Sequence, residues 1–458
     1  MIDPDLRSTD PLVGSGVGKR GPTGLLFSES LLGILSRVLT YVGGFVSAFL
    51  AGLFLTPGEQ GLFFSFLSFA MLYVFVELGL NTVIVQFTSH EKALVDSARD
   101  ETERSRAASR LVSVGRFAFS WFGIGAVLFA FLTGPFGLFF FRGEPFAAAI
   151  LGPWLCLALF VALDIALFPF WSLLEGSGEI RVVYGYRCIR AIAMTAGTSL
   201  SLAAGAQLWS LAVGFAATLP VSAYVLLKFR YFFLRYRSTA KAERVSWKHE
   251  MLPLQWRLAL SWLAGYVAAW AITPVTLKML GPEAAGQIGM SWAVAAGVGA
   301  IASSVVQVKA PLFGTLVATR RYAELDRLAL RQGLLSIGLA SMGAIAALGL
   351  VHTFAVRGYP LAARFLPLGP MALILAAAVL MQITVPMSVY LRAHKREPYL
   401  WLSLVYGACS LFVAVILGHL IGIAGIPAAY FSTAALLALP WGTVIFLRCR
   451  REWHRDAP

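Results

Sequence analysis

The stretch L-T-P-G-E-Q-G, residues 55–61, opens the segment that decides the fold of this chain. An uninterrupted apolar run follows and leads into V-E-L-G-L-N, residues 76–81, and then into the charged end of V-I-V-Q-F-T-S-H-E-K, residues 83–92. A helix rises 1.5 Å per residue, so about 25 apolar residues are enough to cross a hydrocarbon core roughly 30 Å thick. The stretch predicts a membrane-spanning helix bounded by a Pro/Gly turn and a charged segment.

Two polar residues, Glu77 and Asn81, lie one helical turn apart inside this apolar run. An ionised carboxylate in contact with lipid is costly, and such residues face protein or a water-filled cavity. We therefore expect a membrane protein with many spans and a polar interior.

The composition excludes the soluble classes. Of the 458 residues, 58% are hydrophobic and only 13% are charged, about half the charged share of a soluble domain. The four cysteines are scattered, and no spacing typical of a metal site occurs. We expect neither a cofactor nor a metal.

Twelve spans are predicted from the apolar runs. They cover residues 29–54, 62–88, 112–133, 148–172, 184–204, 208–229, 255–279, 287–308, 329–352, 369–391, 399–420 and 424–447. Of the 37 Lys and Arg residues, all but Arg142, Lys278, Arg357 and Arg364 fall on the side that holds both termini. Positive charge stays cytoplasmic, so we expect both termini in the cytoplasm. This distribution also explains the net charge of +14 without a nucleic-acid partner.

A short repeat divides the chain into halves. L-T-P-G-E-Q-G (55–61) follows the first span, and L-G-P-E-A-A-G (280–286) follows the seventh, so both turns read L-x-P-x-x-x-G. We expect an all-α fold with two six-helix lobes around a central cavity, as in transporters built from parallel repeats. The predicted parts are a cytoplasmic segment (1–28), a first lobe (29–229), a basic linker (230–254), a second lobe (255–447) and a cytoplasmic tail (448–458).

Most charges inside the spans belong to the first half: Arg37, Glu77, Asp164, Arg187 and Arg190. Counted from the cytoplasmic ends of their spans, Arg37, Glu77, Asp164 and Arg190 lie about 9–17 Å deep and share one layer. Opposite charges at equal depth are expected to pair, Arg37 with Glu77, and Asp164 with Arg187 or Arg190. Two interpretations stay open: the charges only hold helices together, or they line a cationic cavity for an anionic group such as a pyrophosphate.

The second half carries few charges in its spans, and Lys309 near the cytoplasmic end of span eight adds to the expected cationic entrance. No G-x-x-x-x-G-K-[ST], H-E-x-x-H or nucleophile-elbow pattern occurs. The predicted external loops are short. These features disfavour an enzyme and favour a secondary transporter.

The chain resembles bacterial polysaccharide and O-antigen flippases, within the multidrug/oligosaccharidyl-lipid/polysaccharide exporter superfamily. The resemblance extends over essentially the whole chain. It is carried by L-T-P-G-E-Q-G-L-F-F-S-F (55–66), V-E-L-G-L-N (76–81), L-L-E-G-S-G-E-I (173–180), Q-W-R-L-A-L-S-W-L-A-G-Y (255–266), K-A-P-L-F-G (309–314) and Y-L-R-A-H-K-R-E-P (390–398).

This resemblance implies a transporter that moves an undecaprenyl-diphosphate-linked oligosaccharide across the bacterial cytoplasmic (inner) membrane. A polysaccharide polymerase and glycosyltransferases are the partners it implies, besides membrane lipids. The positions best matched to the diphosphate are Arg37, Arg187 and Arg190, with Lys309 at the entrance.

The two acids, Glu77 and Asp164, are the coupling or charge-pairing residues in this interpretation. Glu77 is the candidate for ion or proton coupling, or it merely neutralises Arg37.

Two alternatives remain. A cation-coupled multidrug exporter has the same fold, but exporters of that kind commonly place an acid in the first span, whose interior here carries Arg37 and no acid. A non-transporting scaffold of a polysaccharide assembly complex is the other alternative.

Overall fold

The computed structural model describes residues 22–142, 147–234, 243–394 and 396–454. Throughout these residues the regular secondary structure is helical, and no strand occurs among them. The predicted all-α class is confirmed. The predicted segment 1–28 lies almost wholly outside the described residues, and α1 begins at Pro22.

The first half contains nine helices in the described residues. They are α1 (Pro22–Phe54), α2 (Pro57–Ala70), α3 (Val74–Glu77), α4 (Leu80–Ser97), α5 (Glu101–Phe140), α6 (Ala147–Gly176), α7 (Ile180–Ala203), α8 (Trp209–Lys228) and the short α9 (Arg230–Leu234). A 3-10 turn, Met71–Tyr73, joins α2 to α3.

The second half begins with a π-helical turn, Trp247–Met251. Its α-helices are α10 (Leu252–Ala269), α11 (Ile272–Leu280), α12 (Pro282–Gln307), α13 (Ala310–Ala318), α14 (Tyr322–Val356), α15 (Leu368–Ala393), α16 (Leu400–Ile421), α17 (Gly425–Thr433) and α18 (Leu439–Trp453). A π-helical turn, Ala434–Ala438, joins α17 to α18, and single 3-10 turns lie at Pro360–Arg364 and Gly422–Ala424.

Ten helical stretches of the described chain are long and apolar enough to cross a membrane. One of them, Leu400–Trp453, has 54 residues and reverses at Gly422, whose φ of 67° ends α16, so it makes two crossings. The helix α7 is not among the ten, yet its 24 residues are enough for one crossing. Counted in this way, the helices agree with the twelve predicted spans.

The predicted turn at residues 55–61 forms a helix start. Thr56 and Glu59 make a capping box, in which the Thr56 hydroxyl accepts from the Glu59 backbone N–H while the Glu59 carboxylate accepts from the Thr56 N–H at 2.8 Å. Pro57 occupies the first turn, where its missing N–H costs nothing. The repeated turn also begins a helix with a proline, Pro282 of α12, but its N-cap residue is Gly281, with a φ of 88° and no side-chain cap.

The two glycines that end the repeated motif meet where the halves cross. A Cβ added to Gly61 would lie 1.8 Å from the Pro282 carbonyl oxygen, and one added to Gly286 would lie 3.0 Å from the Gly61 nitrogen. Only glycine allows the backbones of α2 and α12 to approach this closely. Beside them, the Gln60 side-chain amide donates to the Gly286 and Arg364 carbonyls at 3.0 and 3.2 Å, and this network closes one end of the molecule.

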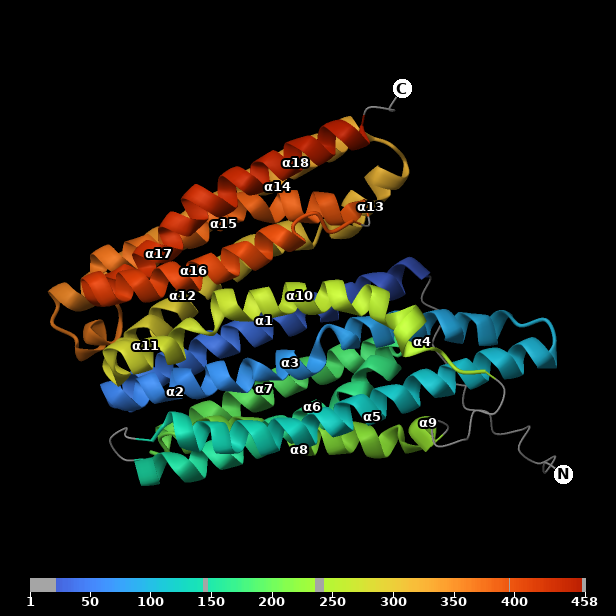
Figure 1. The fold of residues 1–458 in the computed structure, drawn as a ribbon, viewed down its shortest axis with the longest axis horizontal. Helices are drawn as coiled ribbons and strands as arrows, with labels where there is room; N and C mark the ends of the chain where they lie inside the picture. Colours follow the sequence, from blue (N-terminus) through green and yellow to red (C-terminus); the bar gives the residue numbers. More distant parts are fainter. Residues whose placement is uncertain (1–21, 143–146, 235–242, 395, 455–458) are drawn as a thin grey trace.

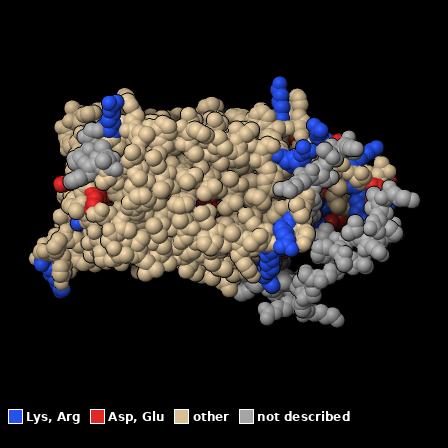
Figure 2. All heavy atoms as spheres, turned by 90° about the horizontal axis from the view of Figure 1, so that it is seen from below, with Lys and Arg blue, Asp and Glu red and all other residues tan. Residues whose placement is uncertain are grey.

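The helices form two groups that run close together at this closed end and spread toward the other end (Figure 1). We call the end with Gly61 and Gly286 the narrow end, and the end with the start of α5 and the last turn of α18 the wide end. Figure 2 shows charged side chains gathered toward the two ends of the molecule and a nearly uncharged middle. The arrangement fits a protein that crosses a membrane many times.

We predict that Gly61→Val will open the narrow end. The added side chain would overlap the backbone of α12, and overpacking of a tight contact costs about 1–3 kcal/mol, enough to lower closure about tenfold. Cysteines introduced at Gly58 and Pro282, which are in contact across the halves, report closure through disulfide cross-linking on a background without the native cysteines.

The matched control is Gly44→Val on α1, because a Cβ at Gly44 would meet no atom within 4 Å. Cross-linking that is equally efficient in Gly61→Val and in the control would contradict this role of the glycine contact.

Candidate functional site

The predicted charged layer lies inside the first lobe, where α6 and α7 run side by side. Arg190 donates to the Asp164 carboxylate at 2.6 Å, and Asp164 is buried. Of the two arginines expected to pair with Asp164, the structure brings Arg190 to it. Arg190 keeps 28% of its side-chain surface accessible, so the pair is not sealed from its surroundings.

Arg187 pairs with an acid that sequence reasoning missed. Its guanidinium donates to Glu175 at 2.7 Å and lies 5.1 Å from the centre of the Tyr184 ring. Glu175 lies in the motif L-L-E-G-S-G-E-I, beyond the predicted end of span four and just before two glycines. This position was the sequence signal that could have identified it as a partner for Arg187. Since 42% of the Arg187 side chain is accessible, its remaining donors are open to a further partner.

Glu77 ends α3 at a break in the middle of the second span. Leu78 and Gly79 have φ angles of 45° and 70°, a left-handed conformation that stops the helix. The Glu77 carboxylate is buried and accepts from the Asn81 amide at 3.0 Å. Asn81 in turn accepts from the Ser172 hydroxyl at 2.6 Å, so Glu77 faces protein, as the sequence predicts.

The predicted ion pair between Arg37 and Glu77 is not formed. Arg37 is exposed on α1, and no described acid lies within ion-pair distance of it. The reason is that α1 packs lengthwise against α7, with the Tyr184 ring on Gly33 and Thr195 in contact with Gly43. This packing sets which way α1 faces and keeps Arg37 apart from Glu77. Arg37 therefore remains a cation without a described counter-charge.

Lys309 is not brought to the arginines. It is exposed at the start of α13 in the second lobe, while α7 belongs to the first lobe (Figure 1). The structure thus gathers Arg187, Arg190, Asp164 and Glu77 in one lobe and leaves Lys309 apart.

Aromatic residues that sequence reasoning did not select surround the Arg190–Asp164 pair. Tyr73 and Tyr186 are both close enough for the two charges to act on their hydroxyl groups. Tyr186 also stacks on Trp171 with ring centroids 3.7 Å apart. Their spacing along the chain gives no sign of this cluster, because it joins three separate helical segments.

The sequence selects three arginines and two acids for this layer, and the structure adds a third acid, Glu175. With Glu175 included, three acids face three arginines in the described residues. Asp164 and Glu175 are each paired with an arginine, whereas the buried Glu77 is held by an amide. The groups available to an external anion are the exposed Arg37 and the open side of Arg187.

No family model matches this sequence, and no curated protein sequence matches it. Solved structures do match over nearly the whole chain. An inward-facing multidrug resistance MATE family transporter of the MOP superfamily has a TM-score of 0.56 and 14% identity, covering 96% of this chain and 97% of that one.

The lipid II flippase MurJ in an inward closed conformation has a TM-score of 0.60 and 15% identity, covering 94% of this chain and 90% of that one. The MATE multidrug transporter DinF-BH has a TM-score of 0.56 and 16% identity, covering 94% of this chain and 97% of that one. At such identities the likeness shows the fold alone, and the chain shares its fold with these solved proteins. These neighbours are transporters or flippases.

We predict that Asp164→Ala will destabilise the protein strongly. It leaves Arg190 without its partner between helices, and breaking a buried pair by removing one member costs about 3–5 kcal/mol. A lower thermal unfolding temperature in detergent measures the loss, and Asp164→Ala combined with Arg190→Met should recover most of it.

Asp96→Ala is the control, since it removes an exposed pair with Lys92 that contributes about 0–1 kcal/mol. If Asp164→Ala and Asp96→Ala unfold at the same temperature, the Asp164–Arg190 pair does not hold α6 and α7 together.

Proposed function

We propose that the protein is a flippase that moves a lipid-linked oligosaccharide from the inner to the outer leaflet of the bacterial cytoplasmic membrane for polysaccharide biosynthesis. One observation carries the proposal: Arg37 is exposed on α1 with no described acid beside it, while Asp164 and Glu175 are already paired with arginines. A cation kept free at membrane depth is costly, and a diphosphate is an anion that offsets the cost.

The two exposed cationic groups have different roles in the proposal. Arg37 and the open side of Arg187 bind the diphosphate of undecaprenyl-diphosphate-linked oligosaccharide, since guanidinium and phosphate oxygens make strong charge-assisted bonds. The Arg190–Asp164 pair holds the lobe together beneath them. Lys309 acts only at the entrance, on the other lobe.

The structure's shape supports the direction of transport. The narrow end is closed by the Gly61–Gly286 contact, and the helices spread toward the wide end (Figure 1). With the wide end and both termini in the cytoplasm, as the distribution of Lys and Arg predicts, the head group enters from the inner leaflet. Rocking of the two lobes then opens the narrow end to the outside.

A multidrug exporter is the second candidate, and Glu77 is the observation that favours it. A buried carboxylate held by an amide rather than by a cation is suited to taking up a proton during transport. In a deletion strain a flippase predicts accumulation of undecaprenyl-linked intermediates, whereas an exporter predicts changed drug sensitivity and normal intermediates.

We predict that Arg37→Ala and Arg187→Ala will each slow flipping about tenfold or more, because a hydrogen bond to a charged group contributes about 1.5–3 kcal/mol. The assay uses proteoliposomes with a fluorescent lipid-linked oligosaccharide and follows its transfer to the leaflet accessible to a membrane-impermeant reagent.

Arg116→Ala provides the matched control, since Arg116 is an exposed arginine on α5. Full activity of both variants at normal protein levels would reject the anion site. An inactive wild-type protein would instead leave the non-transporting scaffold as the alternative.

A further inference from the structure

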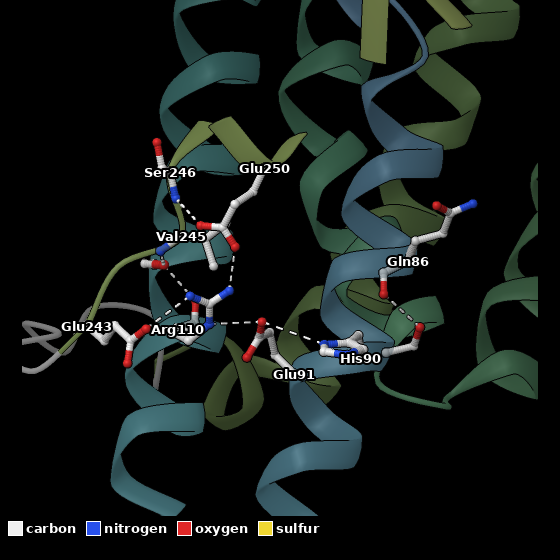
Figure 3. A network of polar contacts seen from close by, with 10 residues as sticks. Gln86, His90, Glu91, Arg110, Glu243, Val245, Ser246 and Glu250 are labelled. Atoms are coloured by element: carbon white, nitrogen blue, oxygen red, sulfur yellow. Dashed lines mark hydrogen bonds and ion pairs between the residues drawn. The ribbon is translucent and has the colours of Figure 1, made fainter. Parts of the chain in front are cut away.

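A single arginine at the wide end contacts three carboxylates from two parts of the chain (Figure 3). Arg110 of α5 donates from Nε to Glu91 of α4 at 3.0 Å. From its two terminal nitrogens it donates to Glu243 at 3.2 Å and to Glu250 at 2.6 Å. Glu91 belongs to the first lobe, whereas Glu243 and Glu250 belong to the segment that connects the lobes.

A backbone contact also fixes the same segment to α5, because the Val245 N–H donates to the Ser113 hydroxyl of α5 at 2.9 Å. Within the segment, the Ser246 N–H donates to the Glu250 carboxylate at 2.8 Å and holds this partner of Arg110 in place (Figure 3). Trp247 follows directly and packs against Trp121 of α5, with ring centroids 5.8 Å apart. We call this set of contacts, made by residues 243–250 against α5, the linker clamp.

The linker clamp leads directly into α10, which contacts both lobes. Near its start, the Trp247 indole donates to Gln255 at 2.7 Å, and Leu258 lies against Gly79 of the first lobe. Further along, the Ala264 carbonyl lies 2.8 Å from a Cβ added to Gly407 of α16 in the second lobe. The helix α10 thus contacts the first lobe near its start and again at Tyr266, whose hydroxyl donates to the Ser68 carbonyl at 3.3 Å, and it contacts the second lobe through Ala264.

We propose that Arg110 is a positioning residue for transport, which holds the start of α10 on the first lobe and thereby couples the movements of the two lobes. Any rocking of the second lobe is transmitted through α16 to the later part of α10. Because the clamp keeps the start of α10 in place, the helix bends rather than leaving the first lobe. The break between α10 and α11, at Trp270 and Ala271, lies beyond this point.

The chemistry explains why an arginine occupies the position. Its planar fork of donors serves three carboxylates at once, which a lysine ammonium does not match in geometry. Glu91 is only 1% exposed, and its second carboxylate oxygen has no hydrogen-bond partner in the described residues. Arg110 is therefore the cation that makes the buried charge of Glu91 tolerable, and the connecting segment shares it.

The test must remove the linker clamp without unfolding the first lobe. Arg110→Gln exposes Glu91 to the full cost of an unpaired buried charge, so the main variant is Glu243→Ala with Glu250→Ala, which leaves the Glu91–Arg110 pair intact. The control is Glu101→Ala with Glu103→Ala, two exposed glutamates at the start of α5.

Spin labels at Ser105 of α5 and Trp256 of α10, on a cysteine-free background, report the position of α10 by double electron–electron resonance. We expect the clamp variant to broaden the distance distribution and to shift its mean by about one helical turn, or about 5 Å, while the control keeps the wild-type distribution.

A wild-type distribution in the clamp variant would overturn the proposal. The readout needs no substrate, so it stands or fails independently of the proposed flippase activity. The second readout, flipping in proteoliposomes, should fall several-fold in the clamp variant and stay unchanged in the control. Normal flipping despite a displaced α10 would also reject the role in transport.

Discussion

The high cost of an ion in hydrocarbon governs the interior of this protein. Asp164 and Glu175 each have an arginine partner, and Glu77 is held by the Asn81 amide within a break of its helix. These contacts tie α3, α6 and α7 into one lobe. Within the charged layer, Arg37 is left exposed with no described acid beside it, so the proposed function depends on the same constraint that stabilises the fold.

The two halves are joined by different kinds of contact at the two ends of the molecule. At the narrow end, two glycines let the backbones of α2 and α12 touch. A contact between backbone atoms cannot adjust by a change of side-chain rotamer. At the wide end, the lobes are connected through a polar clamp around Arg110 and through α10. A tight backbone crossing at one end with a charged connection at the other is an arrangement in which the lobes can rock about the crossing.

The sequence predicts the spans, the two halves and one of the ion pairs because each depends on local pattern or on depth along a helix. Apolar length defines a crossing, and the repeated L-x-P-x-x-x-G motif marks both helix starts at the narrow end. Equal depth was not sufficient for Arg37 and Glu77, because depth does not specify which face of α1 packs on α7. Glu175 was missed for the same reason, since the packing of α6 against α7 places it beside Arg187. Tyr184 lies one turn before Arg187 on α7, so helical spacing alone predicts their contact.

The central claim is that exposed arginines of the first lobe bind a lipid-linked diphosphate. A cryo-electron microscopy structure of the protein in nanodiscs with undecaprenyl-diphosphate-linked oligosaccharide tests it most directly. The account predicts diphosphate density in contact with the guanidinium groups of Arg37 and Arg187. Density bound only on the outer surface of the second lobe, with both arginines facing lipid acyl chains, would contradict it.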